Sequence, residues 1–157
     1  MKYLNFALLL VLVACGRPPA SNQQSTEVVQ RQRFQTLTSA YKEVEGEYTG
    51  TLTLIEDNAN YLAKLELRVV TENDPQTGLP LSPVLVGSLG IFEDENSAAI
   101  VTYGITKGSY DSKDQRLALE VSNTLSIRGE GDRLEISAML QSTVKGDVGE
   151  LKLERSP

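Results

Sequence analysis

The chain has 157 residues, of which 40% are hydrophobic and 23% are charged, as is ordinary for one globular domain and unlike a disordered chain. The 15 Lys and Arg and 21 Asp and Glu residues give a formal net charge of −6. A negative protein is not attracted to nucleic acid or to an anionic membrane surface, so the charge argues against both as electrostatic partners. With no His and one Cys, the chain lacks the residues for a Ser-His-Asp triad, a His-bearing zinc site, CxxC redox chemistry or an internal disulfide.

The N-terminal segment has the layout of a secretory signal peptide. Lys2 is the one charge before an uncharged and mostly aliphatic run at residues 3–15. This run is about half the roughly 20 apolar residues that a transmembrane helix needs. We therefore expect residues 1–14 to be a cleaved signal peptide and not a retained membrane span.

The run ends in Leu12-Val13-Ala14-Cys15, which resembles the lipobox of bacterial lipoproteins. The resemblance implies cleavage before Cys15, acylation of its thiol and attachment to a membrane, to which each buried methylene contributes about 0.8 kcal/mol. In Gram-negative lipoproteins an Asp after the Cys often marks the inner membrane; Gly16 stands here, which implies the outer membrane, with the domain expected to face the periplasm. An ordinary signal peptide with a buried Cys is the alternative.

Residues 15–33 are predicted to be the lipidated Cys followed by a flexible spacer. The segment is rich in Pro, Ser, Asn and Gln and has few large apolar side chains, so it cannot bury enough surface to offset the entropy of ordering. Residues 34–45 are predicted to form a short helix that covers an end or an edge of the domain. The prediction rests on apolar residues at helical spacing: Phe34, Leu37, Tyr41 and Val44.

Residues 46–157 carry a period of two, which predicts strands with one dry and one wet face. Ala63, Leu65 and Leu67 alternate with Lys64 and Glu66, for example. The predicted strands are 48–54, 63–69, 85–91, 117–121, 134–140 and 149–153, with two weaker ones at 101–105 and 125–127.

The connections between these strands are short and rich in Gly, Asn and Asp, so neighbouring strands must be antiparallel. About eight strands in up-and-down order favour a closed all-β barrel, because closure removes exposed edges; a β-sandwich is the alternative. A transmembrane barrel needs an apolar outer band with aromatic girdles, whereas this chain has 6% aromatic residues and no Trp.

Two short stretches resemble ligand-binding barrels. Gly46-Glu47-Tyr48 is similar to the Gly-x-Trp start of lipocalins, with Tyr in place of Trp, and residues 108–111 echo biotin-binding barrels. Each match covers three or four residues. The resemblance implies the barrel shape and no individual binding residue.

Two acidic clusters are candidate sites of chemistry. Glu93, Asp94 and Glu95 are consecutive, so their side chains point apart and do not match the alternating ligands of a calcium loop. Asp111 and Asp114 could be the carboxylate pair of a glycoside hydrolase, but no aromatic residues of a sugar site accompany them. We predict no catalytic residue, no metal and no cofactor, and expect the protein not to be an enzyme.

The remaining candidates are the large amphipathic side chains of the domain, Tyr48, Tyr61, Tyr103 and Tyr110. Aliphatic side chains are numerous enough to fill an eight-stranded interior, so we expect a packed core and a binding patch near these tyrosines at one barrel end. The predicted function is a membrane-anchored, non-catalytic module that binds another envelope protein or has a structural role. The alternative is a lipocalin-like carrier of a small apolar ligand.

Overall fold

The computed structural model describes residues 21–157, so the predicted signal peptide and Cys15 lie outside the described residues. One helix precedes eight strands. In chain order the elements are α1 (Ser21–Glu43), β1 (Gly46–Leu54), β2 (Asn60–Val70), β3 (Val84–Phe92), β4 (Val101–Asp111), β5 (Arg116–Glu120), β6 (Leu125–Gly131), β7 (Glu135–Ser142) and β8 (Gly146–Arg155).

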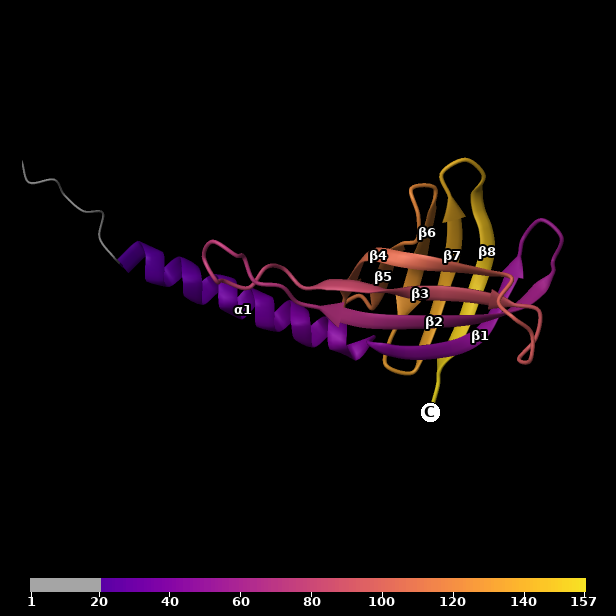
Figure 1. Ribbon diagram of the computed structural model, residues 1–157, viewed down its shortest axis with the longest axis horizontal. Coiled ribbons are helices and arrows are strands. Elements are labelled where there is room, and N and C mark those ends of the chain that lie inside the picture. Colours follow the sequence, from indigo (N-terminus) through magenta and orange to yellow (C-terminus); the bar gives the residue numbers. More distant parts are fainter. Residues whose placement is uncertain (1–20) are drawn as a thin grey trace, which may run out of the picture.

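The strands form a closed antiparallel barrel in up-and-down order (Figure 1). Each strand pairs with the next one in the chain, and β8 returns to pair with β1, from Tyr48 opposite Arg155 to Leu54 opposite Gly149. The predicted eight-stranded barrel with an N-terminal helix is therefore confirmed. The sandwich alternative is wrong, because the β1–β8 ladder leaves no free edge between two layers.

The period of two in the sequence becomes the inside and outside of the barrel. On β2, Ala63, Leu65 and Leu67 are at most 1% exposed, whereas Lys64 between them is exposed. One predicted inward residue is not inward: Leu134 precedes β7, lies in the β6–β7 turn and is 71% exposed. Leu134 belongs to the turn and not to the strand, because Asp132 Oδ1 accepts hydrogen bonds from the backbone N–H groups of Leu134 and Glu135.

Helix α1 is longer than predicted, since it begins at Ser21 and not at Phe34. The part of the predicted spacer from residue 21 to residue 33 is thus helical. The last turns pack on the barrel, where Ala40, Tyr41 and Val44 join the buried core. The side chains of residues 26–33 are exposed, and the N-terminal part of the helix projects away from the barrel (Figure 1).

Arg155, near the end of β8, fastens the end of α1 to the barrel. Its guanidinium donates to the carbonyl oxygens of Glu45 and, at 3.1 Å, Arg133, and stacks over the ring of Tyr48 at 5.7 Å. A cation at this place also satisfies carbonyl groups that a helix leaves unpaired at its C-terminus. Gly46 lies close to this side chain, so that a Cβ at this position would be 2.6 Å from the guanidinium.

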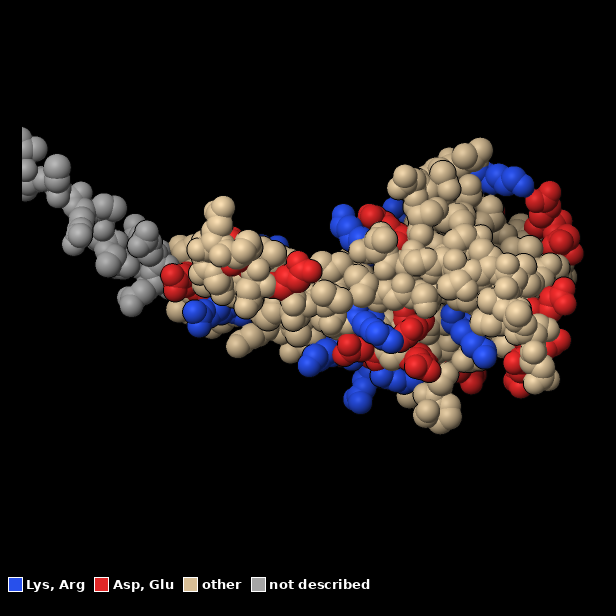
Figure 2. Space-filling view, in the orientation of Figure 1, with Lys and Arg blue, Asp and Glu red and all other residues tan. Residues whose placement is uncertain are grey.

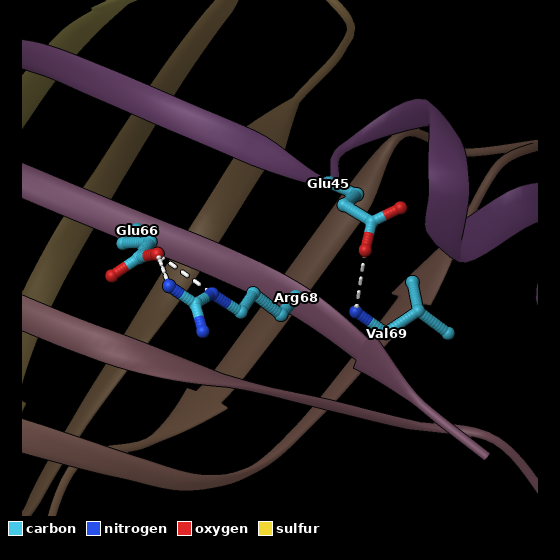
Figure 3. A network of polar contacts seen from close by, with 4 residues as sticks. All are labelled: Glu45, Glu66, Arg68 and Val69. Atoms are coloured by element: carbon cyan, nitrogen blue, oxygen red, sulfur yellow. Dashed lines mark hydrogen bonds and ion pairs between the residues drawn. The ribbon is translucent and has the colours of Figure 1, made fainter.

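Glu45, in the link between α1 and β1, supplies a hydrogen bond that β1 cannot (Figure 3). The β1–β2 ladder ends at Gly46 opposite Leu67, so the N–H of Val69 has no strand partner on that side. Glu45 Oε1 accepts this N–H at 3.0 Å. The carboxylate thus extends the ladder beyond the first residue of β1.

Candidate functional site

The two ends of the barrel differ in how they are closed. At the first, which we call the helix end, the C-terminus of α1 covers the opening, and Tyr48 and Val44 are completely buried beneath it. At the second, the open end, four short loops at residues 55–59, 93–100, 121–124 and 143–145 join the strands. None of these loops contains a helix that could cover the opening.

A cavity of about 470 Å³ lies at the open end. Its lining comes from seven strands and the loop before β4, and all of it is apolar or aromatic except one carboxylate, Glu93. The lining residues are Leu52, Leu54, Tyr61, Ile91, Glu93, Ile100, Val101, Tyr103, Leu125, Leu140 and Val148. Pockets for small ligands have about this size and this predominantly apolar character.

The cavity has a buried floor and a partly wet wall. Leu52, Ile91 and Leu140 form the floor and are 1%, 7% and 5% exposed. The wall residues, Tyr61 and Tyr103 among them, are only partly buried although they pack on the core. Apolar surface is thus in contact with water inside a concave site, and a ligand that displaced this water would gain free energy.

The loops around the cavity are acidic. They contain five carboxylates, at Glu56, Asp57 and residues 93–95, against one cation, Lys145. Lys145 Nζ is already paired with Glu56 at 3.2 Å. Figure 2 shows these acidic groups as the red cluster at the right, over the end of the molecule opposite α1.

Asp94 belongs to this acidic rim and is held in its charged form. Its Oδ1 accepts the backbone N–H of Asn96 at 2.8 Å. This hydrogen bond lowers the pKa of Asp94 below its usual value, with a smaller contribution from the hydroxyl of Ser97. Asp94 therefore remains negative at a lower pH than an ordinary Asp does.

The four candidate tyrosines do not form one patch. Tyr48 and Tyr110 lie at the helix end and are buried, at 0% and 5% exposed. Tyr61 and Tyr103 lie at the open end and line the cavity. The structure thus divides the predicted set into two structural residues and two that face a candidate binding site.

Tyr48 and Tyr110 are suited to closing the helix end. The hydroxyl of Tyr48 donates to the carbonyl oxygens of Val44 at 3.1 Å and Asp132 at 3.2 Å, a shared hydrogen bond that links the segment after α1 to the β6–β7 turn. Burial raises the pKa of Tyr48 above 10.0, against a smaller opposing effect of Arg155. Burial likewise raises the pKa of Tyr110. Both side chains remain neutral at physiological pH.

Two other hollows have a different chemistry. One of about 590 Å³ lies beside the end of α1 and is lined by both signs of charge, including Lys42, Glu43 and Asp132. The other, of about 560 Å³, lies on the outside of β4–β6 between Asp111 and Arg128. Both hollows are lined by several charged side chains of both signs, whereas one charged side chain, Glu93, lines the open-end cavity, so the open-end cavity is the better candidate site for an apolar ligand.

The acidic clusters considered from the sequence are engaged in local contacts. Asp111 Oδ1 accepts the N–H of Lys113 at 3.0 Å, and Asp114 forms an ion pair with Arg116. Within residues 21–157 no three potential ligands are placed to hold a metal ion. The part of the chain described by the structure also contains no helix long and apolar enough to cross a membrane.

Comparison of the chain with protein-family models, with curated proteins and with solved structures gave no match. The candidate site therefore has to be argued from its own residues.

Sequence reasoning missed the cavity because it counted inward side chains without placing them along the barrel axis. Leu54, Val101, Leu125 and Val148 are inward and apolar, but each lies at or near the end of its strand. No helix lies beyond them to cover them, because the four loops at this end contain none. An apolar residue at a strand end, next to a short loop and without a covering helix, is the sequence signal of this cavity.

Proposed function

We propose that this protein is a lipid-anchored lipoprotein of the bacterial envelope whose barrel binds the apolar part of a small ligand in the open-end cavity and catalyses no reaction. The observation that carries the proposal is the asymmetry of the barrel. One end is closed by α1 and buried tyrosines, and the other holds an apolar cavity of about 470 Å³. This is the carrier function that the sequence offered as its alternative.

The size and lining of the cavity support reversible binding of an apolar group. Burial of apolar surface is worth about 25 cal/mol per Å², so binding that removes about 200 Å² of apolar surface from water, ligand and lining taken together, gains roughly 5 kcal/mol before the entropy of association is subtracted. The two tyrosines add flat, rigid surface at little entropic cost. No side chain of the described cavity lining has the arrangement of a nucleophile with an adjacent base.

Binding is tested with phenylnaphthylamine, an apolar fluorescent probe that is uncharged at neutral pH, and the full chain carrying Cys15→Ser so that no acyl group competes. Val148→Trp places an indole in the cavity and should weaken probe binding at least about tenfold. The matched control is Val144→Trp, on the neighbouring hairpin tip at 84% exposure, which should leave binding unchanged. Equal effects of the two substitutions, or no binding by the unsubstituted barrel, would refute the proposal.

The anchor is a separate part of the proposal and rests on Leu12-Val13-Ala14-Cys15. We expect Cys15→Ser to abolish incorporation of labelled acyl chains and to release the protein from the outer-membrane fraction, because two or three chains supply the membrane affinity. Unchanged membrane association of this variant would contradict the lipoprotein assignment.

A protein partner that inserts an apolar segment into the same cavity is the second candidate, and it corresponds to the envelope-protein partner expected from the sequence. Native mass spectrometry of the protein extracted from its host distinguishes the two. A retained small molecule supports the carrier function. A retained protein that Val148→Trp releases supports the protein partner and contradicts the carrier function.

A further inference from the structure

The head group of the ligand can be inferred from what surrounds the open-end cavity, on the assumption that the proposed function is correct. An amphiphile whose chain fills the cavity leaves its polar head at the mouth, among the loops at residues 55–59 and 93–100. Glu93 lines the cavity itself, and Asp94 and Glu95 follow it in the same loop. The head thus meets several carboxylates at once.

These carboxylates are not neutralised by neighbouring cations. Lys145 is the one Lys or Arg in the four loops, and its ammonium group contacts Glu56 and not residues 93–95. A negative head group, such as a carboxylate or a phosphate, would bring like charges together at the mouth. A positive head group would restore local neutrality.

The aromatic side chains favour the same sign of charge. Tyr61 and Tyr103 line the cavity and are only partly buried, so part of each ring is accessible to a ligand. The face of an aromatic ring attracts an ammonium group, and rings combined with carboxylates form the usual environment of bound quaternary ammonium ions. In this barrel both kinds of group belong to the same concave site.

We infer that the ligand of the open-end cavity is a cationic amphiphile, with a single hydrocarbon chain in the cavity and an amine or quaternary ammonium head between Glu93, Glu95 and the two tyrosines. Fatty acids and anionic phospholipids are selected against by the same rim. The acidic rim therefore sets specificity, while the apolar lining provides most of the affinity.

The test compares three probes with the same hydrocarbon chain: dodecyltrimethylammonium and dodecyl sulfate below their micellar concentrations, and the uncharged dodecanol below its solubility limit. They compete with phenylnaphthylamine for the full chain carrying Cys15→Ser. We expect the cation to bind at least about tenfold more tightly than the sulfate, with dodecanol between them. The preference should shrink as salt rises, because charges at an exposed mouth are screened over roughly 10 Å at 0.1 M salt.

The double variant Glu93→Gln, Glu95→Gln should reduce this preference to about threefold or less, because it removes two carboxylates from the mouth of the cavity. Its matched control, Glu47→Gln with Glu72→Gln, removes two exposed carboxylates at the helix end and should keep the full preference. Equal affinity for all three probes, lowered for each by Val148→Trp, would overturn this inference and uphold the proposed function. Failure of every probe to bind would overturn both.

Discussion

Replacement of Gly87 by Ala tests how closely the backbones of β2 and β3 approach each other. Gly87 occupies an inward position of β3, between Leu85 and Leu89, where neighbouring residues are large. A Cβ at Gly87 would lie 1.8 Å from the carbonyl oxygen of Glu66 and 3.2 Å from the Cα of Leu67, both on β2. These are backbone atoms, so rotation of a side chain cannot relieve the clash.

The expected effect is a large loss of stability for one added methyl group. Overpacking of a closely packed region costs about 1–3 kcal/mol, and a backbone clash of this severity belongs at the upper end of that range or beyond it. Gly104→Ala is the control, because a Cβ at Gly104 on β4 has no atom within 4 Å. There the substitution should be neutral or stabilising by up to about 1 kcal/mol, since Gly destabilises a strand and loosens the unfolded chain.

Urea unfolding followed by circular dichroism measures both variants, in the background of Cys15→Ser. We expect the free energy of unfolding to differ by at least about 2 kcal/mol between Gly87→Ala and Gly104→Ala, with the same m-value. In thermal unfolding this difference corresponds to roughly 5 °C for a chain of this size. Equal stability of the two variants would show that β2 and β3 do not approach each other as the structure describes.

Two further predictions concern the packing and the closure of the barrel. Leu67→Asp, which buries an unpaired charge, should unfold the domain or destabilise it by more than about 4 kcal/mol. Glu66→Lys on the outer face should change stability by about 0.5 kcal/mol. Equal effects of the two substitutions in urea unfolding would contradict the assignment of inward and outward residues on β2. Tyr48→Phe should cost about 1–2 kcal/mol at pH 7, because two carbonyl groups lose their donor. Since burial raises the pKa of Tyr48 above 10.0, the stabilisation by its hydroxyl is complete below pH 10 and is lost as pH rises through the folded-state pKa. The difference in unfolding free energy between the native protein and Tyr48→Phe, measured in urea, should therefore narrow in alkaline buffer. A difference that widens there would refute the assignment.

The barrel could be predicted from the sequence because its determinants are local. The alternation of Ala63, Leu65 and Leu67 with Lys64 and Glu66 fixes which face of β2 is buried, and every connection between strands except residues 71–83 is too short for a crossover helix. Closure then follows from the cost of exposed strand edges. These three pieces of information suffice for the strand count, the pairing order and the core.

The full extent of α1 could not be predicted from apolar spacing. From Thr26 to Arg33 the helix buries no side chain, so no apolar stripe marks it. The relevant signal is intrinsic propensity, since Gln, Arg and Glu are good helix formers and Glu27 and Arg31 are one turn apart in the favourable order. A composition that is rich in polar residues therefore indicated a flexible spacer where the chain is helical.

The candidate site was recognised only in part. Tyr61 and Tyr103 were selected from the sequence and do line the cavity, but they were grouped with Tyr48 and Tyr110, which close the opposite end. Strand polarity decides between the ends: Tyr48 is near the start of β1 and Tyr61 near the start of the antiparallel β2. Consideration of strand direction alone would have separated the two pairs.

The projection of α1 from one end of the barrel also determines where the binding site lies relative to the N-terminal part of the chain. At 1.5 Å per residue, the 23 residues of α1 span about 35 Å, and the helix joins the barrel at the end opposite the cavity (Figure 1). If Cys15 is held in a membrane, α1 separates the anchor from the barrel, and the mouth lies at the end of the barrel remote from α1. A ligand would then enter the barrel from the side opposite its connection to the anchor.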